Sequence, residues 1–302
     1  MTGEVDPAHL ANAETAKALF IASKNPRSGA HDWHFALRRA RRIVAAALRA
    51  SDYLRDVPRA LMEGGSHMRV YRHFMAPPMS QDQFKLICKV WSKGSENNNQ
   101  PLTSGKAAEV SAAFLSWRDP GIGRWLEREA MPTRQEVREV LLKIAPLIAS
   151  QDLATLKRNE MANKQEQEVV DLLLRKGWTK LPSKLIDERA AVPTKNFMHK
   201  TRFATSTTAS QEVDVACGLK GTYVTAMECK VTNDETNSVK RVNDIIKKAK
   251  AWQDHWGSFV VTAALLQGVV AAKDVQRLTD NKIKVFWSHD LNAFGKWIDS
   301  MS

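Results

Sequence analysis

Residues 211–231 read QEVDVACGLKGTYVTAMECKV, and this stretch decides the fold of the second half of the chain. Because successive side chains of a strand point to opposite faces, the alternation on either side of Gly218 predicts two strands joined by a tight turn. The apolar residues would then face a core, while Asp214, Glu228 and Lys230 would converge outside it. Two carboxylates and an ammonium form a site for a hard divalent cation and an attacking water, which is the chemistry of phosphodiester hydrolysis.

The composition of the chain indicates a folded, basic protein. Hydrophobic residues make up 43% and charged residues 26% of 302 residues, proportions that favour packed globular structure over disorder. This length accommodates one large domain or two ordinary ones. The formal net charge of +12 and a pI near 9.7 favour salt-sensitive attraction to phosphate backbones, although many basic proteins bind no nucleic acid specifically.

The cysteines and the N-terminus bear on the cellular compartment. Cys88, Cys217 and Cys229 form no CxxC pair and are odd in number, so neither a disulfide framework nor a zinc site is indicated. The first residues lack the basic and apolar regions of a secretion signal, and no run of about 18 apolar residues predicts a membrane span. We therefore expect a cytoplasmic protein without a membrane partner.

The first half of the chain, residues 1–150, is predicted to be mainly helical. Apolar residues at helical spacing predict helices over 33–49, 80–91, 106–117 and 133–148, the second of them capped by Ser80. The polar segment 92–101 reads as a loop. Its Asn97, Asn98 and Asn99 could pair with adenine edges, or the loop could simply be solvated.

The second half, residues 151–302, is predicted to be an α/β domain. A helix over 161–176 ends at Gly177, extended segments follow around 178–186, and an irregular stretch then reaches Ala209. Beyond the two strands of the hairpin, the predicted elements are a helix over 235–256, a strand over 258–270, a helix over 272–279, a strand over 282–288 and a helix over 291–301. This order predicts a mixed central sheet flanked by helices on both faces.

These residues resemble the PD-(D/E)xK nuclease superfamily. Its signature of an Asp, a short gap and (Asp/Glu)-x-Lys matches Asp214 and Glu228-Cys229-Lys230, although Val213 stands where the superfamily name has proline. Segments 165–178, 213–216 and 227–232 are similar to the catalytic core of archaeal Holliday-junction resolvases. The longer connection over 177–213 and the N-terminal half are more similar to type II restriction endonucleases, within which the XamI-type enzymes are the expected group.

The resemblance implies a restriction-endonuclease-like core and a role for each residue of the signature. Asp214 and Glu228 would bind Mg²⁺, with Mn²⁺ as a substitute, and the carbonyl of Cys229 would add a ligand. Lys230 would orient or help to deprotonate the attacking water and offset charge on the phosphorus. Alternatively, Asp214 and Lys230 could form an ordinary cross-strand ion pair, which would leave the position of Glu228 unexplained.

Two residues are candidates for the acidic ligand on the preceding helix. Glu166 and Glu168 lie about 200° apart around a helix axis, so only one of them can face the site. The apolar pattern around them does not decide between the two. The resolvase-like alignment to Gly177 selects Glu166 as the catalytic and metal-binding acid.

Several basic residues near the predicted site are candidates for DNA contact, although each could be a solvated surface charge. They are Lys195, His199, Lys200, Arg202, Lys240 and Arg241. The leading hypothesis is a type II restriction endonuclease, a homodimer that cuts double-stranded DNA at a short sequence and acts beside a cognate methyltransferase. Residues 1–150 would serve recognition or dimerisation. The alternatives are a structure-selective nuclease of junction or repair type and a non-catalytic DNA-binding protein on the same fold.

Overall fold

The computed structural model describes residues 6–206 and 209–302, and the chain divides into two compact units. The helical unit comprises Pro26–Leu156, and the sheet unit comprises Lys157–Ser302 with the described part of Met1–Asn25. We expected a boundary near residue 150, and the division falls six residues later. Residues 1–5, on which the expected lack of a secretion signal partly rests, lie outside the described residues. Within the described ranges, no helix is both long and apolar enough to cross a membrane.

The helical unit is built around an aromatic core. Its helices are α2 (Pro26–Ala50), α3 (Val57–Glu63), α4 (Met68–Tyr71), α5 (Gln81–Ile87), α6 (Lys93–Asn97), α7 (Ser104–Trp117) and the first part of α8 (Arg134–Arg175). Large side chains that are almost completely buried fill the space between them, namely Tyr71, Phe74, Phe84, Trp91, Phe114 and Trp125. As predicted, Ser80 caps α5, and it forms a capping box with Gln83.

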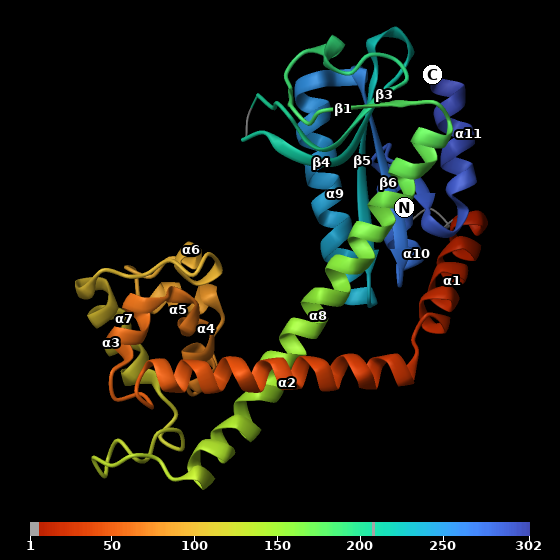
Figure 1. Cartoon of the computed structure of the whole chain (residues 1–302). Coiled ribbons are helices and arrows are strands. Elements are labelled where there is room, and N and C mark those ends of the chain that lie inside the picture. Colours follow the sequence, from red (N-terminus) through yellow and green to blue (C-terminus); the bar gives the residue numbers. More distant parts are fainter. Residues whose placement is uncertain (1–5, 207–208) are drawn as a thin grey trace. The chain divides into compact units, whose positions relative to one another are not determined.

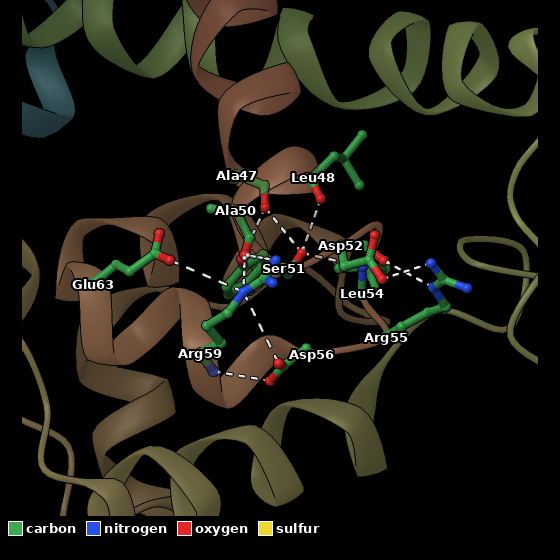
Figure 2. Close-up of polar contacts among 11 residues, drawn as sticks. Ala47, Leu48, Ala50, Ser51, Asp52, Leu54, Arg55, Asp56, Arg59 and Glu63 are labelled. Carbon is green, nitrogen blue, oxygen red and sulfur yellow. Dashed lines mark hydrogen bonds and ion pairs between the residues drawn. The ribbon is translucent and has the colours of Figure 1, made fainter.

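A left-handed turn ends α2. Residues 52–54 have positive φ angles of 46°, 56° and 69°, a region that disfavours non-glycine residues. The buried hydroxyl of Ser51 holds this turn, since it donates to the carbonyl of Ala47 at 2.9 Å and accepts from the N–H of Leu54 at 3.1 Å (Figure 2). The turn therefore depends on one serine, whose hydroxyl bonds a backbone carbonyl before it and a backbone N–H after it.

Two arginines add to the same turn. Arg59 on α3 donates from Nη2 to the carbonyl of Ala50 at 3.0 Å, which satisfies the end of α2. Arg55 pairs with Asp52 at 2.6 Å (Figure 2). Both arginines are partly exposed, so we assign the buried Ser51 the larger share of the stabilisation.

The sheet unit contains one mixed sheet. Its strands in the described residues are β1 (Thr179–Leu181), β2 (Leu185–Ile186), β3 (Asn196–Phe203), β4 (Gln211–Gly218), β5 (Val224–Thr232), β6 (Val260–Gly268) and β7 (Lys284–Trp287). The order is β1-β3-β4-β5-β6-β7, with β2 also paired to β3. The pairs β3–β4 and β4–β5 are antiparallel and the others are parallel, which confirms the predicted mixed sheet.

Helices cover both faces of this sheet (Figure 1). On one face, α8 and α11 (Leu291–Met301) pack against a core that includes Val215, Met227 and Cys229. On the other face lie α1 (Pro7–Ala22), α9 (Glu235–Trp256) and α10 (Ala272–Asp280). The helix α9 has the bounds predicted for it, because Asp234 caps its start and Gly257, at φ 58°, follows its end.

Several expectations about the elements were wrong. The helix predicted over 80–91 ends at Ile87, because Cys88 already has an extended backbone. The stretch predicted to be irregular contains β3, in which Phe197 and Met198 are both buried, so strict alternation is absent. The segment 92–101 is not wholly a loop, because Ser92 caps the short helix α6. The two helices predicted over 133–148 and 161–176 are the ends of a single 42-residue helix, α8. Its middle consists largely of good helix formers and contains no glycine.

Candidate active site

The sheet divides at the strands that carry the predicted acidic residues. Pairing of β4 with β5 runs from Gly218↔Val224 to Val215↔Met227 and stops there. Beyond this point β4 stays with β3 as far as Phe203↔Gln211, and β5 stays with β6 as far as Thr232↔Gly268. We call this divergence the fork, made of residues 211–214 of β4 and 228–232 of β5. Side chains, rather than backbone pairs, connect the two strands across it.

Asp214, Glu228 and Lys230 meet at the fork, as predicted. The Nζ of Lys230 lies 2.7 Å from Oε2 of Glu228 and 3.1 Å from Oδ2 of Asp214. The same oxygen of Asp214 accepts the backbone N–H of Cys229 at 2.7 Å. The two carboxylates therefore share one cation between diverging strands. This is the juxtaposition that the alternation in 211–231 predicts.

The charged groups are more enclosed than the sequence suggested. We expected them outside the core, but the side chain of Glu228 is 0% exposed and Lys230 is only 14% exposed. The reason is that Glu228 faces α9, whose side chains cover this part of β5. Cys229 points the opposite way, into the core beside α8, as its place in the alternation predicts.

Sequence reasoning missed Lys248, which belongs to this cluster. Its Nζ lies 2.9 Å and 2.8 Å from the two carboxylate oxygens of Glu228 and donates to the carbonyl of Glu212 at 2.8 Å. A signal for it exists in the sequence. Lys248 follows Ile245 by three residues and precedes Trp252 by four, and both of these are buried, so the lysine lies on the inward face of α9.

Enclosure alters the proton affinities of the cluster. Burial raises the pKa of Glu228 and so does Asp214, while Lys230 and Lys248 oppose the shift. Burial alone would lower the pKa of Lys230, but Glu228 and Asp214 outweigh it and raise that pKa above its ordinary value. Lys230 is therefore held as a cation, which suits it to orienting a water and offsetting negative charge rather than accepting a proton.

Glu166 lies in a separate pair of contacts beside this cluster. It is 7% exposed, accepts from Nε2 of His199 at 2.8 Å and lies 3.2 Å from Nζ of Lys200. In the described residues, no hydrogen bond or ion pair joins it directly to the groups at the fork. Its charge nevertheless acts on Cys229, the residue between Glu228 and Lys230. Burial, and then the negative charges of Asp214, Glu166 and Glu228, raise the pKa of the Cys229 thiol, while Lys230 opposes the shift.

Glu168 has a different environment from Glu166. It is half-buried, and its charged partner is Lys164 at 4.0 Å on the same helix. It lines a cavity of about 170 Å³ with residues such as Met161 and Gln267. The two glutamates therefore face different surroundings, as expected for positions about 200° apart on one helix, and Glu166 is the one bonded to β3.

The candidate DNA contacts lie in several places. His199 and Lys200 are on β3 and are engaged with Glu166, while Arg202, also on β3, pairs with Glu212 at 2.8 Å. The remaining candidates in the sheet unit are Lys195, which precedes β3, and Lys240 and Arg241 in the first half of α9. The asparagines belong to the helical unit, where Asn97 bonds to Gln81 at 2.8 Å, Asn99 bonds to Ser66, and Asn98 ends α6.

The donors at the fork fit a hard divalent cation. Two carboxylates already share a cationic group there, and both present oxygen ligands. Over residues 6–206 and 209–302, no three His, Cys, Asp or Glu side chains gather as a complete metal site. Mg²⁺ takes one or two protein carboxylates and completes its shell with waters and substrate phosphate. Asp214 and Glu228 would hold it, with the carbonyl of Cys229 as a further donor.

Comparisons with known proteins identify the family of the chain. The family model described as XamI restriction endonuclease matches residues 52–287, a range that contains the whole fork and Lys248. The type II restriction enzyme XamI of Xanthomonas campestris pv. amaranthicola is 34% identical over 193 residues, which is 62% of this chain. The chain spans 66% of the length of that relative.

One solved structure is similar to most of the chain. The alignment with protein VC1899 from Vibrio cholerae covers 92% of this chain and 58% of the chain of VC1899. The sequence identity is 10% and the TM-score is 0.30, so this likeness assigns neither fold nor function. The family match rests instead on the sequence, and it extends over most of both units. The chain therefore belongs to the XamI restriction endonuclease family.

Proposed function

We propose that this protein is a Mg²⁺-dependent type II restriction endonuclease that hydrolyses phosphodiester bonds of duplex DNA at a short sequence. The observation that carries the proposal is the cluster of Asp214, Glu228 and Lys230 at the fork, in a chain of this family. A surface ion pair accounts for it poorly, because Glu228 is fully buried between two lysines.

The residues at the fork have complementary roles in this proposal. A bound divalent ion supplies an activated water and neutralises charge on the scissile phosphate. Asp214 and Glu228 hold that ion. Lys230, a stable cation, orients the water and offsets the charge that develops on the phosphate oxygens.

Glu166 remains the candidate for the catalytic and metal-binding acid on α8, and its contacts with His199 and Lys200 hold it against β3. Lys195, Arg202, Lys240 and Arg241 remain candidates for phosphate contacts, and Asn97, Asn98 and Asn99 for base contacts. The helical unit would then contribute to recognition or dimerisation.

The proposal extends to assembly and partners. A short palindromic site is matched by a twofold dimer, in which each copy cuts one strand. A cognate methyltransferase would protect the host DNA from the enzyme.

The first test is digestion of long duplex DNA of known sequence in Mg²⁺, with Asp214→Asn as the control. The asparagine keeps an oxygen that can accept the Cys229 N–H but weakens the cation site, so we expect the rate to fall by more than about 100-fold. Discrete fragments from the wild type, lost in the variant, would support the proposal, and end sequencing would locate the cut.

Two other results would overturn the proposal in different ways. Cleavage of four-way junctions but not of plain duplex would support a structure-selective nuclease. DNA binding without cleavage of either substrate would support a non-catalytic DNA-binding protein. Binding of the Asp214→Asn variant to DNA in Ca²⁺ checks that the variant is folded.

A further inference from the structure

We propose that Lys248 is a positioning residue of the nuclease site, which joins the two strands of the fork and sets the orientation of Glu228. The link to cleavage rests on the proposed function, whereas the joining of the strands does not. The first support is the location of its contacts. The ammonium binds the Glu212 carbonyl on β4 and the Glu228 carboxylate on β5, at the level where backbone pairing between these strands has stopped.

The second support is the number of bonds to Glu228. Lys248 donates to both carboxylate oxygens, at 2.9 Å and 2.8 Å, while Lys230 lies 2.7 Å from Oε2. A glutamate carboxylate that is held through both oxygens cannot rotate freely about the Cγ–Cδ bond. Metal-binding side chains depend on such supporting contacts for their orientation. Lys248 thus fixes the plane in which Glu228 presents its oxygens.

The third support is that two lysines balance the charge of Glu228, which leaves Lys230 available for the substrate. If Lys230 alone balanced the buried Glu228, it would be committed to that carboxylate. Because Lys248 also balances Glu228, Lys230 can turn toward a substrate phosphate without leaving an unpaired buried charge. Lys248 comes from α9, which lies alongside β4 and β5 (Figure 1), so its anchor is independent of the strands that it joins.

The test compares Lys248→Met with Lys248→Arg and with Lys250→Met as a matched control. Lys250 is exposed and lies about 200° around α9 from Lys248, so its loss leaves the fork untouched. In the metal-free protein, we expect Lys248→Met to speed amide hydrogen exchange at residues 212–214 and 228–230 by about tenfold or more. The rest of the sheet should exchange at the wild-type rate.

The second measurement is DNA cleavage at saturating Mg²⁺. We expect Lys248→Met to lower kcat by about 10–100-fold with little change in KM, because Lys248 orients a ligand and does not contact DNA. Lys248→Arg should recover most of the loss, since a guanidinium can bind both oxygens of a carboxylate.

The outcomes separate this inference from the proposed function. An unchanged kcat in Lys248→Met, or exchange that accelerates throughout the sheet, would overturn the positioning role while leaving the nuclease intact. A wild-type protein that cuts no DNA would overturn the proposed function, and the hydrogen-exchange comparison would still decide whether Lys248 joins the strands.

Discussion

At the scale of single residues, the two glutamates of α8 differ in what surrounds them. Glu166 is buried and bonded to His199 and Lys200, while Glu168 is half-buried and paired with Lys164 on the same helix. We expect Glu166→Gln to lower the cleavage rate by about 10–100-fold, because it weakens a charged contact beside the fork. Glu168→Gln should stay within about twofold of the wild type, because it weakens only a long i,i+4 pair with Lys164 along the helix.

The measurement is single-turnover cleavage of one duplex substrate by both variants under identical conditions. The two substitutions are chemically the same, which makes each the control for the other. A larger loss for Glu168→Gln than for Glu166→Gln would reverse the assignment of the helical acid.

The residues of the site were predictable to different degrees. Asp214, Glu228 and Lys230 lie close together in the sequence, and the period of a strand is enough to bring them to one place. The contact between Glu166 and His199 joins residues 33 positions apart, and that between Lys248 and Glu228 spans 20. These contacts depend on how α8 and α9 pack on the sheet, which local spacing does not specify.

At the scale of elements, the turn after α2 makes a measurable contribution to stability. Ser51 is fully buried, and its hydroxyl accepts from the N–H of Leu54 within three left-handed residues. We expect Ser51→Ala to lower the free energy of unfolding by about 1–3 kcal/mol, because a buried N–H loses its acceptor.

Urea unfolding followed by circular dichroism would measure this change. Ser116→Ala is a suitable control, because the Ser116 hydroxyl only donates back to the carbonyl of Ala113 on an exposed surface of α7. A Ser51→Ala variant as stable as the Ser116→Ala variant would contradict the assigned role of the turn.

The elements with clear boundary signals were predicted well. The helix α9 begins after a capping Asp234 and ends before Gly257, and α11 has the predicted bounds. The strand β3 was missed because Phe197 and Met198 are both buried and polar residues such as Lys200 follow them, so the sequence shows no regular alternation there. The short α6 was missed because a polar segment reads as a loop whether or not it turns once as a helix.

At the scale of the whole molecule, the charge of the chain should govern its affinity for DNA. There are 45 Lys and Arg residues against 33 Asp and Glu, a formal surplus of 12 positive charges. We expect binding of the inactive Asp214→Asn variant to duplex DNA to weaken by about 10³-fold or more between 50 and 200 mM salt. Each phosphate that is neutralised releases counterions, so the loss should be linear on a double-logarithmic plot.

Fluorescence anisotropy with a labelled duplex would measure this dependence. The same titration on a duplex that lacks the cleavage site separates the two contributions to affinity. Similar slopes with different intercepts would indicate that charge provides general attraction and base contacts provide selectivity. An affinity that is independent of salt would exclude the basic surplus as a major source of binding.

The hydrogen bond from Cys229 to Asp214 has an evolutionary consequence. In an ordinary sheet that N–H would be bonded to a backbone carbonyl, but here a side-chain carboxylate replaces it. Replacing Asp214 with a residue that lacks an acceptor would therefore disrupt the sheet as well as the chemistry. Selection for folding alone would disfavour such changes even in a lineage that no longer needed cleavage. An aspartate at this position would therefore be retained even after the cleavage activity is lost. Its presence in a relative does not by itself demonstrate an active enzyme.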